Sequence, residues 1–427
     1  MIDALTADYR APLTEESAAS YVGGTCFKTG PPELVGVELE WLVHDAARPH
    51  DPVPADRLAT TLTDPFDPPL AGLLSTEPGG QLELSSPPAP LAECLAVTSA
   101  DLARLRDRLT AAGLGLAGIG LDPVRPPVRV SDSPRYVAMQ HQFDRRGPEG
   151  RVMMCSTASV QVCLDAGREE RDLAERWHAL HAWVPVLVAM FAHSPLAGGR
   201  PTGWRAARLK VWTEIDPSRT RAPAGQEPRR AYAAWALDAE LLAVRRRGAA
   251  WATPVGLTFR AWLRGSGPGW LAAPTVDDLD FHLSTLFPPV RARGHLELRV
   301  VDAQPRDDWR VVTALVAGLL DDPAARAEAT ALAAGAEAEA AARRGLADPH
   351  LARAAVGFTA AAAAALDRAG HRDLADEVTE WAGRYPARGR TPADDLLDGW
   401  RRQGTGSIPG SIPGPIPGPV PRYEEAW

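Results

Sequence analysis

Four short stretches of the chain alternate between apolar and polar residues with a period of two, which is typical of β-strands with one face in the core. The clearest is GVELEWLV at 36–43, where the apolar positions 37, 39, 41 and 43 alternate with Glu38 and Glu40. This pattern predicts a strand that carries both carboxylates on the same face. A single E-x-E is also typical of a solvated strand face, so its meaning depends on the other three stretches.

The second stretch, residues 73–86, predicts two strands joined by a turn. Pro-Gly-Gly at 78–80 has strong turn-forming chemistry. Glu77 precedes the turn, and Glu83 lies on the polar face of the strand that follows it.

The two remaining stretches repeat the arrangement later in the chain. Residues 154–165 predict a strand with Gln161 on its polar face, and residues 294–302 predict a strand with Glu297 and Arg299 on its polar face. Four such strands imply a sheet whose apolar face lies under helices and whose other face lines a polar cleft.

Between and after these strands, apolar residues recur with the helical period. Residues 1–400 are expected to form a single domain, whose alanine-rich section 309–400 is helical. Residues 401–427 form a tail with an Ile/Val-Pro-Gly repeat, for which two interpretations stay open: a solvated tail, or a ligand for a proline-recognising partner. The other predicted helices cover residues 14–22, 91–112, 168–193, 232–247 and 275–287.

Composition narrows the class of protein. The 427 residues are 45% hydrophobic and 23% charged, as expected of a globular protein with a sizeable core. The net charge of -8 argues against a nucleic-acid binder. The four cysteines form no C-x-x-C pair, no signal peptide is evident, and the longest apolar run, 183–192, is about half of a bilayer span. A cytoplasmic protein with reduced thiols is expected, without membrane partners.

The polar faces of the strands suggest a metal-dependent site. Like charges about 4 Å apart cost roughly 4 kcal/mol per pair at an effective dielectric constant near 20. Hard divalent cations with oxygen ligands relieve such repulsion, and Mg²⁺ usually binds together with phosphates. Arg299 is placed to reach such a phosphate, and Arg208 is a candidate for binding a substrate carboxylate. Because the chain has no P-loop, kinase or dinucleotide motif, any ATP would be held by metals and arginines on a sheet.

Several of these segments resemble the plant-type glutamate–cysteine ligase family, over about residues 14 to 400. FKTGPP and EWLV look most like the actinobacterial branch that makes γ-glutamylcysteine for ergothioneine synthesis. The segments that carry the resemblance are GVELEWLV (36–43), TEPGGQLELS (76–85), MMCSTASVQV (153–162), HLELR (295–299), FKTGPP (27–32) and EWLV (40–43).

The resemblance implies an α+β fold with a curved, mostly antiparallel sheet, helices on its outer face and a core related to glutamine synthetase. It implies that ATP phosphorylates the γ-carboxylate of L-glutamate and that the amine of L-cysteine then attacks the acyl phosphate. Arg299 would stabilise the transferring phosphate, with Glu297 beside it, and Arg208 would hold glutamate. Cys163 stands where the family often has asparagine. The residues that would ligate or orient Mg²⁺ are Glu38, Glu40, Glu77, Glu83, Gln161 and Glu297.

Some assignments have alternatives. Tyr136 either lines the cleft or is a packed aromatic. Glu77 either binds the metal or only has a structural role at the turn. Arg219 and Arg221 either contact nucleotide or lie in a solvated loop. Two other functions are also open. One is a ligase of the same superfamily with a different amine acceptor, and the other is a non-catalytic metal- or nucleotide-binding scaffold that acts through its tail.

Overall fold

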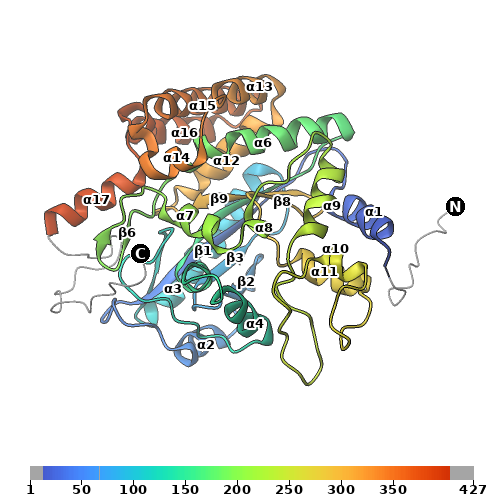
Figure 1. The fold of residues 1–427 in the computed structure, drawn as a ribbon. Helices are drawn as coiled ribbons and strands as arrows, with labels where there is room; N and C mark the ends of the chain where they lie inside the picture. Colours follow the sequence, from blue (N-terminus) through green and yellow to red (C-terminus); the bar gives the residue numbers. More distant parts are fainter. Residues whose placement is uncertain (1–12, 67, 404–427) are drawn as a thin grey trace.

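A computed structural model describes residues 13–66 and 68–403 (Figure 1). Its centre is an open sheet in the order β2-β3-β1-β5-β9-β8, and β4 also pairs with β1. All pairs of named strands are antiparallel, so the predicted mixture of helices with an antiparallel sheet is confirmed. The strands of this sheet are β1 (Val35–Asp45), β2 (Leu73–Thr76), β3 (Leu82–Ser85), β4 (Leu114–Ala117), β5 (Ser159–Leu164), β8 (Val290–Ala292) and β9 (Leu296–Asp302). A separate two-stranded sheet contains β6 (Leu196–Ala197) and β7 (Arg200–Pro201).

Helices cover the apolar face of the large sheet. Contacts to the strands come from α3 (Leu91–Ala111), α6 (Glu170–Met190) and α12 (Trp309–Asp321). The helices coloured orange to red gather together in Figure 1. The remaining helices are α1 (Glu15–Cys26), α2 (Ala55–Thr63), α4 (Pro134–Phe143), α5 (Glu149–Ser156), α7 (Ala207–Ile215), α8 (Pro217–Thr220), α9 (Pro228–Asp238), α10 (Phe259–Leu263), α11 (Val276–Leu283), α13 (Pro323–Leu332), α14 (Ala338–Arg344), α15 (Pro349–Arg368), α16 (Arg372–Arg384) and α17 (Pro392–Gln403), with short 3-10 turns at Gly345–Ala347 and Pro386–Arg388.

The hydrophobic core follows the period-two pattern. Val37 and Leu39 on β1, each 1% exposed, pack in one cluster with the helices that cover the sheet. Burying a side chain of this size contributes about 1.5–3 kcal/mol. Because alternate residues of a strand point to opposite faces, this burial turns Glu38 and Glu40 toward the other face.

Several predicted boundaries differ from the structure. The strand predicted from Met154 begins at Ser159, because residues 149–156 form α5 and bury Met153 and Met154 in a second core against α4 and α7. The helix predicted over 232–247 ends at Asp238, because the chain folds back and Leu241 N–H donates to the carbonyl of Leu257.

The first helix continues past Gly23 and Gly24, where the sequence predicts its end. Arg229 explains the extension, because its Nη1 donates to the carbonyls of Gly23 and Phe27, both at 2.6 Å. These bonds satisfy carbonyls that a helix end leaves unpaired.

At the other end of the chain, α17 runs to Gln403, so the predicted domain boundary at residue 400 falls inside a helix. The proline-rich repeat lies outside the described residues. Across residues 13–66 and 68–403, no helix combines the length and apolar character needed to cross a membrane. The four cysteines are free thiols; Cys26, Cys94 and Cys155 are buried, and Cys163 is partly exposed.

Candidate active site

The polar face of the sheet brings together side chains from strands that are far apart in the sequence. Strand register sets them in rows: Glu83 on β3 lies opposite Glu40 on β1, and Glu38 on β1 lies opposite Gln161 on β5. Ser159 donates a 2.9 Å hydrogen bond to Glu40, which completes the first row. The predicted convergence of acidic groups on one surface is therefore observed for these residues.

The half-buried glutamates repel one another. Burial, followed by the charges of Glu297 and Glu83, raises the pKa of Glu38 to about 7. Burial, followed by the charges of Glu40 and Glu83, raises the pKa of Glu77 to about 8. The charges of Glu40 and Glu83 therefore act on Glu77, although it precedes the turn rather than lying on a strand.

This donor set fits a hard divalent cation. Among the described residues, the carboxylates of Glu38 and Glu77 form no hydrogen bond and no ion pair, although the charge of Arg299 acts on both through space. Two serines donate to Glu83, at 3.2 and 3.3 Å. Carboxylate oxygens with spare lone pairs and mutual repulsion are the ligands that Mg²⁺ prefers.

Glu297 behaves differently because two arginines hold it. It is completely buried. Arg291 on β8 donates to both of its oxygens, at 2.9 and 2.8 Å, and Arg299 Nη1 donates to Glu297 and to Gln161. Burial alone would raise the pKa of Glu297, but the charges of Arg291 and Arg299 lower it to about 2. Glu297 therefore stays ionised and orients Arg299.

A β-bulge determines which residues of β9 face the site. Val160 pairs with Val301 and Val162 pairs with Leu298, so two residues of β9 lie opposite Gln161. The extra residue shifts the alternation, as bulges do. Asp302, opposite Ser159, thereby shares the face of Glu297 and Arg299.

Arg208 approaches this face from α7. Its side chain is buried, and Nη2 donates to the carbonyl of Arg299 at 3.1 Å. The guanidinium carbons of Arg208 and Arg299 lie 5.3 and 5.8 Å from the ring of Trp212. Among the described residues, Nε of both arginines and Nε1 of Trp212 are buried without an acceptor. Buried unpaired donors are costly, so this group is suited to an anionic ligand.

Tyr136 lies at the edge of the same region, on α4. Burial, followed by the charge of Glu77, raises the pKa of Tyr136 to about 12. Its ring also packs against the second hydrophobic core. The alternative of a packed aromatic is therefore observed, and a position in the cleft with a contact to substrate stays a prediction. The neighbouring Arg135 donates to the hydroxyl and the carbonyl of Ser284, both at 2.8 Å.

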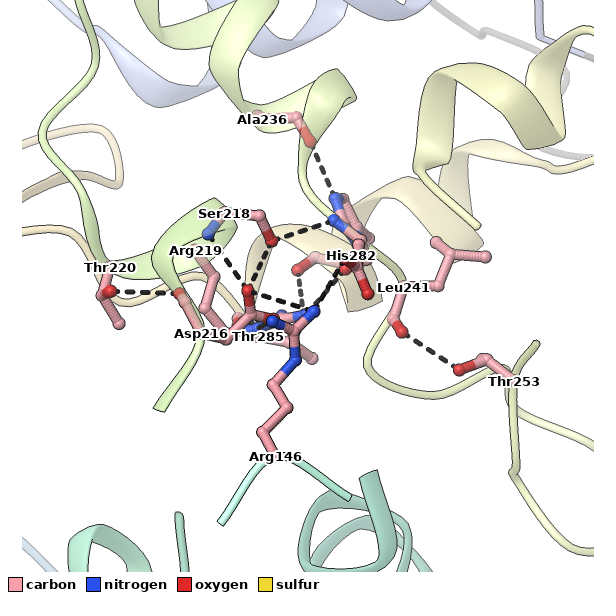
Figure 2. Close-up of polar contacts among 11 residues, drawn as sticks. Arg146, Asp216, Ser218, Arg219, Thr220, Ala236, Leu241, Thr253, His282 and Thr285 are labelled. Carbon is pink, nitrogen blue, oxygen red and sulfur yellow. Dashed lines mark hydrogen bonds and ion pairs between the residues drawn. The ribbon is translucent and has the colours of Figure 1, made fainter. Parts of the chain in front are cut away.

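The prediction that Arg219 contacts nucleotide is wrong, as is the alternative of a solvated loop. Arg219 is completely buried in α8, and its guanidinium donates to Asp216 (2.7 Å) and to the carbonyls of Thr285 (3.0 Å) and Glu240 (2.7 Å). Figure 2 shows this network, in which protein acceptors surround the side chain. Arg219 is therefore a structural residue that links α8 to the segments around it.

The substitution Asp216→Asn tests this structural role. It leaves the Arg219 charge buried without its partner, which is expected to lower the free energy of unfolding by about 3–5 kcal/mol. Burial alone would raise the pKa of Asp216, but the charge and hydrogen bond of Arg219 lower it below its ordinary value. The stabilisation is thus present above the ordinary value of 3.8 and is lost as the pH falls below it.

Urea unfolding of both proteins measures the effect of Asp216→Asn. The control is Asp307→Asn, in an ion pair where Asp307 is 58% exposed, for which a change below about 1 kcal/mol is expected. Weaker ATP binding by folded Asp216→Asn, with unchanged stability, would contradict the structural role.

Sequence reasoning missed Arg291, Asp302 and Ser159. A hairpin signal for Arg291 was present, since Gly294, with a φ of 80°, allows the turn that sets Arg291 opposite Glu297. No sequence signal indicated the bulge that turns Asp302 toward the site.

Comparisons with known proteins agree with this arrangement. The sequence matches the family model described as glutamate-cysteine ligase family 2 over residues 34–412. It is 39% identical over 397 residues to the glutamate–cysteine ligase EgtA of Mycolicibacterium smegmatis, covering 90% of this chain and 91% of that protein. It is 32% identical over 344 residues to the chloroplastic glutamate–cysteine ligase of Arabidopsis thaliana, covering 73% of this chain and 63% of that protein.

Among solved structures, the glutamate–cysteine ligase of Francisella tularensis in complex with AMP is similar in fold. The TM-score is 0.52 at 12% sequence identity, covering 88% of this chain and 86% of that one. The family model, the relatives and the solved structure each match most of this chain, and all three are glutamate–cysteine ligases by description. The chain therefore belongs to glutamate–cysteine ligase family 2.

Proposed function

We propose that this protein is an ATP-dependent glutamate–cysteine ligase that joins the γ-carboxylate of L-glutamate to the amine of L-cysteine. The observation that carries the proposal is the meeting, on one sheet face, of the glutamate cluster with the unpaired donors of Arg208, Arg299 and Trp212. Both relatives described above carry the name glutamate–cysteine ligase. The similarity to EgtA further supports a role in ergothioneine synthesis.

In this proposal the chemistry passes through γ-glutamyl phosphate. A γ-carboxylate oxygen of glutamate attacks the terminal phosphorus of ATP, and ADP leaves. The cysteine nitrogen then attacks the acyl carbon, and phosphate leaves. Phosphorylation turns the carboxylate oxygen into a better leaving group, and the protein assists both steps by positioning the reactants and stabilising the developing charge.

Arg299 is the proposed donor to the transferring phosphate. Glu297 and Gln161 hold its Nη1, which fixes the guanidinium and leaves Nε available. Arg208, with Nε also available, is the proposed partner of a glutamate carboxylate. Arg208 Nη2 donates to the backbone carbonyl of Arg299, so the two arginines lie next to each other. In this proposal their neighbouring positions bring the glutamate carboxylate and the phosphate of ATP close together.

Mg²⁺ is the proposed metal, held by Glu38, Glu40, Glu77 and Glu83, with Gln161 and Glu297 orienting the surrounding groups. When bound, it would screen the anionic groups that must approach one another. Gln161 has a clear orienting role in this scheme, since its Nε2 donates to Glu40 at 2.9 Å while its Oε1 accepts from Arg299.

The proposed reaction is tested by measuring ADP release at constant glutamate while the amine is varied. We expect kcat/KM for cysteine to exceed that for alanine or serine by about tenfold or more, as is usual for pocket discrimination. Chelation of Mg²⁺ should abolish release, and added Mg²⁺ should restore it.

Each alternative function gives a different result in that assay. Faster ADP release with another amine would establish a different acceptor. ATP or metal binding without ADP release for any amine would establish a non-catalytic scaffold.

A further inference from the structure

A second set of metal-ligating side chains lies beside the glutamate cluster. Cys163, His295 and Glu297 each offer one ligand atom, and these atoms lie within 4.8 Å of one another. Strand pairing explains the cluster, because Cys163 on β5 lies opposite Glu297 on β9. His295, two residues before Glu297, points to the same face.

Each of the three side chains has coordinating capacity left. His295 Nε2 is buried and, among the described residues, has no hydrogen-bond partner. Cys163 is a free thiol that is partly exposed, so an ion can reach it. Glu297 Oε2 accepts only one hydrogen bond from the described part of the chain, from Arg291 Nε, and a carboxylate oxygen has two lone pairs.

The residues around Cys163, His295 and Glu297 leave space for an ion and add a negative charge. Gly36 on β1 pairs with Cys163 from the side of β5 that faces away from β9. As a glycine it has no side chain to cover the thiol. Glu38 lies two residues along β1, and its carboxylate partly offsets the two arginines that bind Glu297.

We propose that Cys163, His295 and Glu297 form a binding site for a borderline-soft divalent cation of the zinc class. Sulfur, nitrogen and oxygen ligands together favour Zn²⁺ or Co²⁺, whereas Mg²⁺ prefers oxygen alone. Three protein ligands leave a fourth position for water, as in open zinc sites. On binding, the Cys163 thiol forms a metal–sulfur bond and its proton passes to solvent.

The site has a consequence that rests on the proposed function. Glu297 orients Arg299, so an ion that draws on the Glu297 carboxylate would compete with that contact. Occupation by zinc is therefore expected to slow the ligase reaction, whereas binding of the ion itself does not depend on any activity.

Cobalt titration of the purified full-length protein tests the site without substrates or added thiols. We expect one equivalent of Co²⁺ to produce the near-ultraviolet absorption of a cobalt–thiolate bond. Cys163→Ser should abolish that absorption and weaken cobalt binding by about tenfold or more, since even outer ligand partners contribute at that level. Cys94→Ser, which changes a buried thiol elsewhere, should leave both unchanged.

Thermal melting shows whether each variant is folded. His295→Gln provides a second folded variant, and it should weaken cobalt binding while the thiolate absorption of the residual complex shifts. The proposal is overturned if the wild type shows no cobalt–thiolate absorption, or if either variant binds Co²⁺ as the wild type does. Absence of ADP release in the amine assay with Mg²⁺ and without added Co²⁺ or Zn²⁺, in a protein that shows the cobalt–thiolate absorption when titrated separately, would count against the proposed function alone.

Discussion

Replacing Arg299 with lysine is expected to lower kcat by about a hundredfold to a thousandfold, while the protein melts close to the wild-type temperature. The guanidinium contacts Glu297 and Gln161 through Nη1 and keeps Nε for an anionic ligand. A lysine has a single nitrogen and cannot do both in a fixed geometry. Loss of one preorganised donor to developing charge usually has an effect of this size.

Steady-state phosphate release, with ATP and both amino acids varied, measures the effect of Arg299→Lys. Arg310→Lys is the control, because Arg310 on α12 donates two hydrogen bonds to Glu377 and one to Ser99 at a partly exposed position outside the glutamate cluster. Turnover of Arg299→Lys within about twofold of the wild type would rule out the proposed role of Arg299.

The second large effect is expected from Glu297→Gln. This change leaves Arg291 and Arg299 without their common buried counter-charge, and breaking such a buried pair costs about 3–5 kcal/mol. Arg299 would also lose the group that orients it, so activity should fall together with stability. Urea unfolding measures the loss, and Glu377→Gln should change stability by less than about 1 kcal/mol because that pair is partly exposed.

The pH dependence provides an independent check on Glu297. Its pKa falls from the ordinary value of 4.5 to about 2 in the folded protein, although burial opposes the two arginines that lower it. The carboxylate therefore contributes stability that is fully present above pH 4.5 and is lost as the pH falls toward 2. Glu297→Gln should lack this part of the acid dependence; an unchanged acid profile would contradict the ion pairs.

Much of the site could be predicted from local sequence. Period-two alternation assigned Glu38, Glu40, Glu83 and Gln161 to polar strand faces, because adjacent residues of a strand must point to opposite sides. The Pro-Gly-Gly turn at 78–80 correctly predicted the hairpin of β2 and β3. The segment-level resemblance predicted the family to which the chain belongs.

Local patterns misassigned residues whose setting depends on distant partners. The sequence around Arg219 is typical of a solvated loop. In the structure Arg219 is buried, because acceptors of Asp216, Thr285 and Glu240 surround its guanidinium. Similarly, α1 continues through Gly23 and Gly24 because Arg229 binds the carbonyls at its end.

The sequence by itself determined which residues face away from the core, because hydrophobic burial and strand geometry act on neighbouring positions. Only the tertiary structure decided which of these faces meet. The pairing of Arg291 with Glu297, the bulge opposite Gln161 and the approach of His295 to Cys163 depend on strand register. Register is set by contacts between segments far apart in the chain, whose energies no local pattern contains.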